Sequence, residues 1–69
     1  MSINPRQSTE LRQAEIIATM VRLSAERSPA DITTTDIAKA MGVSQGALFR
    51  HFATKEAIRL AVVEWIDEH

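Results

Sequence analysis

Residues 33–52, "TTTDIAKAMGVSQGALFRHF", carry the start and stop signals of two short helices. Its three threonines and Asp36 form a helix start signal, because a threonine hydroxyl accepts from the first free amides and the carboxylate favours the positive helix end. Gly42 ends that short helix, since glycine tolerates the left-handed conformation just past a helix C-terminus. Ser44 then caps a second helix, expected over about residues 45–52. Two short helices joined by so tight a turn cross steeply and form a helix-turn-helix.

Small and apolar residues on both sides of the turn at residues 42–44 predict a miniature core. Ala38 stands where the two helices approach most closely and only a small side chain fits. Val43 fills the space between the helices, and Leu48 anchors the second helix from beneath. Ile37 and Met41 complete this core.

A longer helix is expected upstream of the helix-turn-helix. Residues 1–8 carry little apolar content and are predicted to be a flexible arm. Ser8 or Thr9 is expected to cap a helix that runs to about Arg27, where Ser28-Pro29 breaks it. Its predicted core-facing stripe recurs at spacings of three and four and consists of Leu11, Ala14, Ala18, Val21 and Ala25, with Ile17, Met20 and Ser24 alongside.

The last helix is expected from about residue 54 to the end of the chain. One apolar stripe on it consists of Ile58, Ala61, Val62 and Trp65. Leu60, Val63 and Ile66 lie beside that stripe and are predicted to stay exposed. The sequence therefore predicts an all-α fold: a small, homeodomain-like bundle of about four helices, with residues 9–69 as one helix-turn-helix domain.

Composition narrows the function. The 69 residues include no cysteine, and we expect no metal site and no cofactor. No nucleophile or metal-ligand pattern accompanies Asp31, Asp36 and His51, so an enzyme is not expected. The absence of a long apolar run and of a signal peptide favours a soluble, cytoplasmic protein. The net charge is −1, but residues 1–59 hold all 8 Lys and Arg residues and 6 of the 9 acidic residues.

The segment "ITTTDIAKAMGVSQGALFRHFATKEAI", residues 32–58, resembles the DNA-binding segment of the tetracycline-repressor (TetR) family of bacterial transcription regulators. The resemblance covers roughly residues 16–62. Its most specific residues are Gly42-Val43-Ser44, Gly46, Leu48-Phe49, His51-Phe52 and Lys55-Glu56. The resemblance implies a regulator, expected to be a repressor, that binds double-stranded operator DNA.

The candidate DNA-binding residues are Thr34, Thr35, Ser44, Gln45, Gly46, Ala47, Phe49, Arg50, His51 and Lys55. A helix in the major groove presents its N-terminal residues to base edges, which places Ser44 and Gln45 there. Gly46 lets the backbone approach the DNA closely. Ala47 is expected to touch a thymine methyl group, and Phe49 to reach sugar or thymine methyl groups, although the family more often has tyrosine at this position.

Phosphate contacts are expected around the base readers. His51 and Lys55 resemble the phosphate contacts of the family, and Lys55 lies in the positive first turn of the last helix. Thr34 and Thr35 can donate to phosphates across the groove, and Arg50 is included by its charge.

Assembly and an alternative function also follow from the resemblance. TetR-like regulators continue into a helical domain that binds an effector and forms a homodimer on an inverted repeat. This chain stops at His69 inside a helix, so we expect a fragment or an incomplete sequence, monomeric or weakly associating. The alternative is a protein-interaction module that docks through Val62, Trp65 and Ile66.

Overall fold

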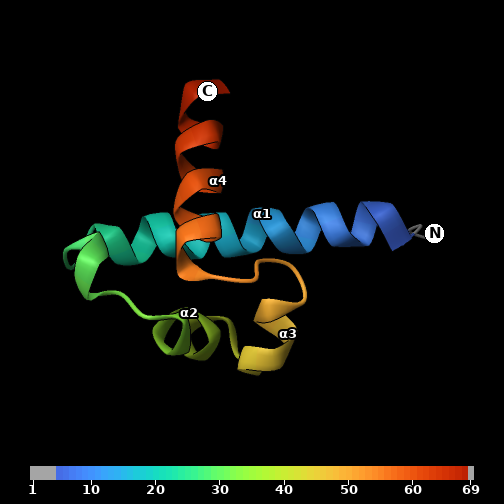
Figure 1. Cartoon of the computed structure of the whole chain (residues 1–69), viewed down its shortest axis with the longest axis horizontal. Coiled ribbons are helices and arrows are strands. Elements are labelled where there is room, and N and C mark those ends of the chain that lie inside the picture. The colour runs from blue at the N-terminus through green and yellow to red at the C-terminus, as the bar shows by residue number, and fades with distance from the viewer. Residues whose placement is uncertain (1–4, 69) are drawn as a thin grey trace.

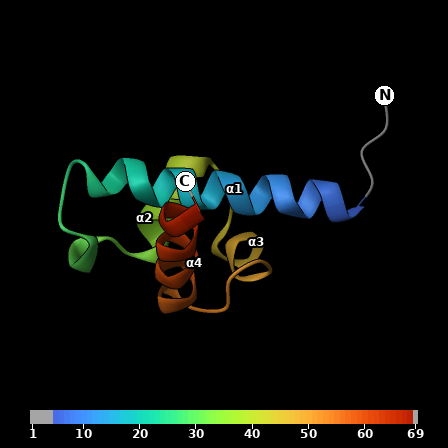
Figure 2. The same ribbon diagram turned by 90° about the horizontal axis from the view of Figure 1, so that it is seen from above.

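The structure is a computed structural model that describes residues 5–68, with side chains from residue 8 onward. Over these residues the chain has helices and no strand: α1 (Pro5–Ser24), the 3-10 helix η1 (Pro29–Asp31), α2 (Thr34–Met41), α3 (Gln45–Phe49) and α4 (Lys55–Glu68). The predicted all-α bundle of about four helices is confirmed. Both α2 and α4 pack against α1, and α2 packs against α3. Figures 1 and 2 show α4 crossing α1 steeply, with the N-terminal part of α1 extending beyond the other helices.

The ends of α1 differ from the sequence prediction. The helix begins at Pro5, whereas a flexible arm was predicted for residues 1–8, of which residues 1–4 lie outside the described part. Proline suits the first turn, because its missing amide hydrogen would have no acceptor within the helix. The other end is Ser24 rather than Arg27. There the Ala25 amide donates to the Arg22 carbonyl at 3.1 Å, a three-residue spacing that tightens the last turn.

The buried face of α1 agrees with the prediction only at Met20, which was placed beside the predicted stripe, whereas the five residues of the stripe itself are exposed. Ile16, Met20 and Leu23 are buried, whereas Leu11 is 51% exposed and Val21 is 38% exposed. Apolar residues surround most of this helix, so two overlapping stripes fit its periodicity. The stripe that turns inward carries larger side chains than the alanine-rich one, and burying more apolar area stabilises the fold more. The wrong prediction therefore came from counting apolar positions without weighing their size.

One core joins the helices. Its buried residues are Ile16, Met20, Leu23, Ile32, Ile37, Ala38, Leu48 and Ile58, with Met41, Val43, Phe52 and Val62 packed against them. The predicted miniature core of the helix-turn-helix is confirmed, because all five of its members belong to this set. Ile32 reaches the core from the segment between η1 and α2, and η1 itself was not predicted.

Local bonds set the ends of α2. The Thr33 hydroxyl accepts from the Asp36 amide at 3.1 Å, and the Asp36 carboxylate accepts from the Thr33 amide at 2.9 Å. This reciprocal pair is a capping box. At the other end Gly42 has φ 70°, the left-handed conformation expected of it. The Val43 amide then donates to the Ala38 carbonyl at 3.0 Å, which closes the turn.

The second helix of the helix-turn-helix is shorter than predicted. Helix α3 begins at Gln45 as expected but ends at Phe49 rather than near residue 52. The His51 amide donates to the Leu48 carbonyl at 3.0 Å, so the chain tightens into a turn there. Phe52 then packs inward against the core. The next helix starts soon after, where the Thr54 hydroxyl accepts from the Ala57 amide at 3.1 Å.

The outer part of α4 is apolar and exposed. Leu60, Val63 and Ile66 are 51%, 45% and 57% exposed, as the sequence predicted. Trp65 on this helix borders an apolar hollow of about 410 Å³ against α1. The far end of α4 carries Glu64, Asp67 and Glu68 and lies across the molecule from α2 and α3 (Figure 1).

Candidate nucleic-acid interface

The N-terminal turn of α3 forms an exposed edge of the molecule. Ser44, Gln45 and Gly46 are all exposed, and Leu48 holds the opposite side of the helix in the core. The Ser44 hydroxyl accepts from the Ala47 amide at 3.1 Å, so Ser44 is the N-cap of this helix. Its hydroxyl hydrogen remains available to a partner, because this bond uses only the oxygen lone pair. Helices α2 and α3 lie at the side of the molecule farthest from the end of α4 (Figure 1).

Two of the predicted contact residues meet across the turn. The Gln45 side-chain amide donates to the hydroxyl of Thr35, which lies in the first turn of α2. Both residues are exposed, so the pair lies on the surface rather than in the core. The neighbouring Thr33 makes the capping box, which leaves the hydroxyls of Thr34 and Thr35 outside the cap.

None of the described residues lies close enough to Gly46 to exclude a larger side chain there. Its φ is not positive, and a Cβ built there would come no closer than 3.8 Å to the Ser44 hydroxyl oxygen, an ordinary contact. Gly42 is the opposite case, because its φ of 70° is one that other residues rarely adopt. A glycine inside a helix lowers its stability, so the structure itself gains nothing from Gly46.

Three further predicted residues, one in α3 and two just after it, lie around a hollow that faces α1. Ala47, Arg50 and His51 line this hollow of about 220 Å³, and Arg12 of α1 lines its other side. Ala47 and His51 are partly buried, and Arg50 is exposed. No sequence pattern indicated that Arg12 belongs to this group, since it lies on a different helix at a distant position. The Arg12 guanidinium also pairs with Glu15 at 3.3 Å.

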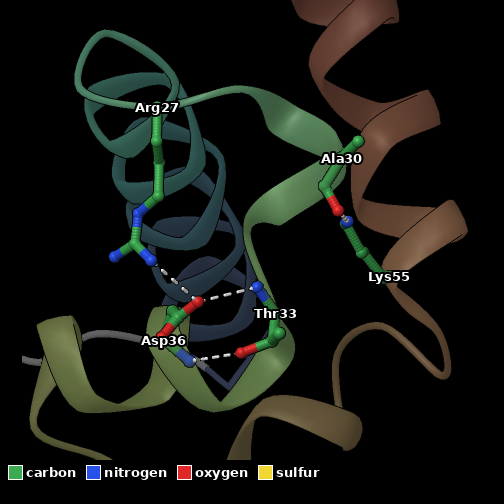
Figure 3. A network of polar contacts seen from close by, with 5 residues as sticks. All are labelled: Arg27, Ala30, Thr33, Asp36 and Lys55. Carbon is green, nitrogen blue, oxygen red and sulfur yellow. Dashed lines mark hydrogen bonds and ion pairs between the residues drawn. The ribbon is translucent and has the colours of Figure 1, made fainter.

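Phe49 and Lys55 complete the set of predicted residues. Phe49, at the end of α3, is 42% exposed, whereas Phe52 turns inward. Lys55 is the first residue of α4, and its ammonium donates to the Ala30 carbonyl of η1 at 3.3 Å (Figure 3). An ammonium has three N–H donors, so this bond leaves donors for an anion.

A polar network fixes α2 beside the end of α1. Asp36 accepts from Thr33 and pairs with Arg27 at 3.3 Å, as Figure 3 shows. The hydrogen bonds from the Thr33 backbone and side chain, followed by the charges of Arg27 and Lys39, hold the pKa of Asp36 below its ordinary value. The carboxylate therefore stays ionised at neutral pH and keeps the start of α2 in place.

These features define a small helix-turn-helix domain of the DNA-binding kind. The family model of the bacterial regulatory proteins, tetR family, matches residues 16–62. The chain belongs to this family, which consists of DNA-binding regulators rather than enzymes. The predicted family and the prediction that the chain is no enzyme are confirmed.

Curated relatives agree with this assignment. Nucleoid occlusion factor SlmA of Haemophilus ducreyi is 35% identical over 65 residues, which are 93% of this chain and 32% of that protein. SlmA of Marinobacter nauticus is 37% identical over 57 residues, 83% of this chain and 29% of that protein. The uncharacterized HTH-type transcriptional regulator Rv1255c of Mycobacterium tuberculosis is 44% identical over 55 residues, 80% of this chain and 27% of that protein.

The chain spans about a third of the length of the relatives it matches. No solved structure gives a significant match. Among the described residues, none of the helices combines the length and the apolar character needed to cross a membrane.

Proposed function

We propose that this chain is the operator-reading domain of a transcriptional repressor and binds duplex DNA in a sequence-specific manner. The observation that carries the proposal is the N-terminal turn of α3. It is exposed and contains a glycine, Gly46, that no contact with the described residues requires. A helix in the major groove presents its N-terminal residues to base edges, and a glycine among them lets the backbone approach the DNA closely.

Base reading is assigned to the start of α3. Gln45 makes paired hydrogen bonds to a base edge, and Ser44 donates its hydroxyl hydrogen beside it. Ala47 and Phe49 supply apolar contacts to thymine methyl or sugar groups.

Phosphate binding is assigned to the groups around that turn. Thr34 and Thr35 contact phosphates of the DNA strand next to α2. Lys55 contacts a phosphate of the DNA strand next to α4, and its ammonium is already held beside η1. Arg50 and His51 add contacts at the end of α3. The phosphate contacts set the register of the domain, and the base contacts set its sequence preference.

The whole protein is proposed to act as a homodimer on an inverted repeat, in the cytoplasm, where bacterial operators are. Its two recognition helices would enter major grooves about one helical turn, ~34–36 Å, apart. Residues 1–69 alone would then bind one half-site. A role in nucleoid occlusion, the one for which the SlmA relatives are named, is the alternative use of the same domain.

Selection of bound sequences from a random pool of duplex DNA tests this proposal, with Gln45→Ala and Lys55→Ala as a contrasting pair. Gln45→Ala should weaken binding to the selected site by about 1–3 kcal/mol and relax the preference at one base pair. Lys55→Ala should weaken binding to all duplexes alike and reduce the magnitude of the salt slope by about one unit.

The same selection experiment distinguishes operator reading from the alternative function, docking on a protein partner. If no sequence is enriched and Gln45→Ala binds every duplex as the wild type does, the operator-reading function is wrong. Binding to a protein partner through Trp65 and the exposed side of α4 would be the function to pursue, and it would respond little to salt.

A further inference from the structure

We propose that Thr35 is a positioning residue for Gln45, and that the pair makes the domain prefer adenine over guanine at the base that Gln45 reads. The inference rests on the proposed function and goes beyond it, because it assigns a base and a determinant on another helix. Its basis is the hydrogen bond from the Gln45 side-chain amide to the Thr35 hydroxyl. The two residues lie on α2 and α3, on either side of the turn.

The bond restricts a side chain that is otherwise mobile. An exposed glutamine samples many rotamers, and fixing it on a base costs conformational entropy. A partner that holds the amide before the DNA arrives removes part of that cost. Thr35 is well placed for this role, because the buried residues that follow it, Ile37 and Ala38, hold α2 in the core.

The bond also determines which hydrogen-bond donors and acceptors of the Gln45 amide remain for the DNA. A glutamine amide has two N–H donors and one carbonyl acceptor. With one N–H given to Thr35, Gln45 retains one donor and its Oε1 acceptor. Adenine presents the matching pair in the major groove, an N7 acceptor and an N6 amino donor. Guanine presents two acceptors, N7 and O6, so Oε1 would face an acceptor and only one N–H would remain for both.

Thr35→Val removes the hydroxyl and keeps the side-chain shape, and Thr35→Ser keeps the hydroxyl. Thr35→Val should weaken binding to the adenine site about threefold to tenfold, the net effect of one hydrogen bond, and should weaken binding to the guanine variant less. In a Gln45→Ala background Thr35→Val should cause a smaller loss than in the wild type, equal on the adenine and guanine sites, because only the phosphate contact of Thr35 is then removed. Thr35→Ser should bind as the wild type does. Thr34→Val, at the neighbouring threonine, is the matched control and should leave the adenine preference intact.

A second readout needs no DNA. In the free protein, the side-chain amide resonances of Gln45 should shift toward those of an exposed glutamine in Thr35→Val but not in Thr34→Val. Unchanged resonances in Thr35→Val would overturn the pairing. An equal loss on adenine and guanine sites that adds to the Gln45→Ala loss would also overturn it, because Thr35 would then be a phosphate contact alone.

The two proposals fail in different ways. A wild-type chain that prefers no sequence would refute operator reading and with it the adenine preference, while the resonances of the free protein still decide whether Thr35 holds Gln45.

Discussion

The helix-turn-helix and α1 share one core, but nearby residues set the ends of α2 and α3, whereas distant residues set the orientation of α1. Helix α2 is capped by Thr33 with Asp36 at its start and by Gly42 at its end, and helix α3 is capped by Ser44 at its start. Each of these caps bonds to residues within four positions along the chain. The C-terminal end of α1 is also closed by local bonds, from the Ala25 amide to the Arg22 carbonyl and from the Arg27 amide to the Leu23 carbonyl. The orientation of α1, in contrast, follows from the face that it buries against η1, α2 and α4. Local bonds therefore fix where helices begin and end, whereas distant packing fixes which side of a helix faces inward.

The largest test of this contrast compares two large apolar residues of α1. Ile16 is 1% exposed and Leu11 is 51% exposed. Ile16→Ala should lower the free energy of unfolding by about 2–5 kcal/mol, because it leaves a cavity in the core. A single core of this size supplies only about 3–5 kcal/mol, so the variant is expected to be largely unfolded at ambient temperature.

Leu11→Ala is the matched variant and should change the free energy of unfolding by no more than about 0.5 kcal/mol. Urea denaturation followed by circular dichroism measures both. Similar losses in the two variants would mean that α1 packs through the stripe predicted from the sequence.

The next effect separates the two glycines. Gly42→Ala should lower the free energy of unfolding by about 1–2 kcal/mol, because the left-handed conformation crowds a Cβ. Gly46→Ala should leave the fold equally stable or stabilise it by up to about 1 kcal/mol, since alanine is the better helix residue. The same Gly46→Ala protein should nevertheless bind its selected DNA site more weakly. Thermal unfolding and a fluorescence binding titration on the same samples give both answers, and undiminished DNA binding would remove Gly46 from the interface.

The smallest effect concerns the cap of α2. Thr33→Ala should lower the free energy of unfolding by about 1 kcal/mol, because it removes the acceptor for the Asp36 amide. Thr33→Ser keeps that acceptor and is the control.

Acid should weaken the same cap. The pKa of Asp36 in the folded chain lies below its ordinary value of 3.8, so its stabilising contribution is complete above that value and is lost as the pH falls through the folded-state pKa. The melting temperature of Asp36→Asn should lie below that of the wild type at neutral pH, and the difference should shrink in acid. A difference that does not change with pH would show that the ionised carboxylate contributes nothing.

The parts of the fold that the sequence predicted are those governed by local chemistry. The cap of α2, the turn glycine and the buried Leu48 follow from residue types at fixed spacings, and all three are present in the structure. The inward face of α1 could not be read in this way, because periodicity admits two stripes and only the distant helices choose between them. The size of Ile16, Met20 and Leu23 was the signal that could have decided it.

In the candidate interface too, features within one helix could be predicted from the sequence, whereas contacts between helices could not. Exposure of Gln45 and Gly46 follows from their place at the start of α3, opposite the anchoring Leu48. The bond between Thr35 and Gln45, the contact of Lys55 with Ala30, and the place of Arg12 beside His51 depend on how separate helices meet. No pattern within one helix indicates such contacts.

Helix α4 points its acidic C-terminal end away from the helix-turn-helix. Its first residue, Lys55, lies near η1, and its last turns carry Glu64, Asp67 and Glu68 at the opposite side of the molecule from the recognition helix. We therefore expect the field of a polyanion to turn the chain before contact, with the acidic end pointing away, although the net charge is only −1. Orientation of this kind acts on the rate of association more than on the lifetime of the complex. Salt should therefore slow the encounter of this domain with DNA even though its net charge gives no attraction.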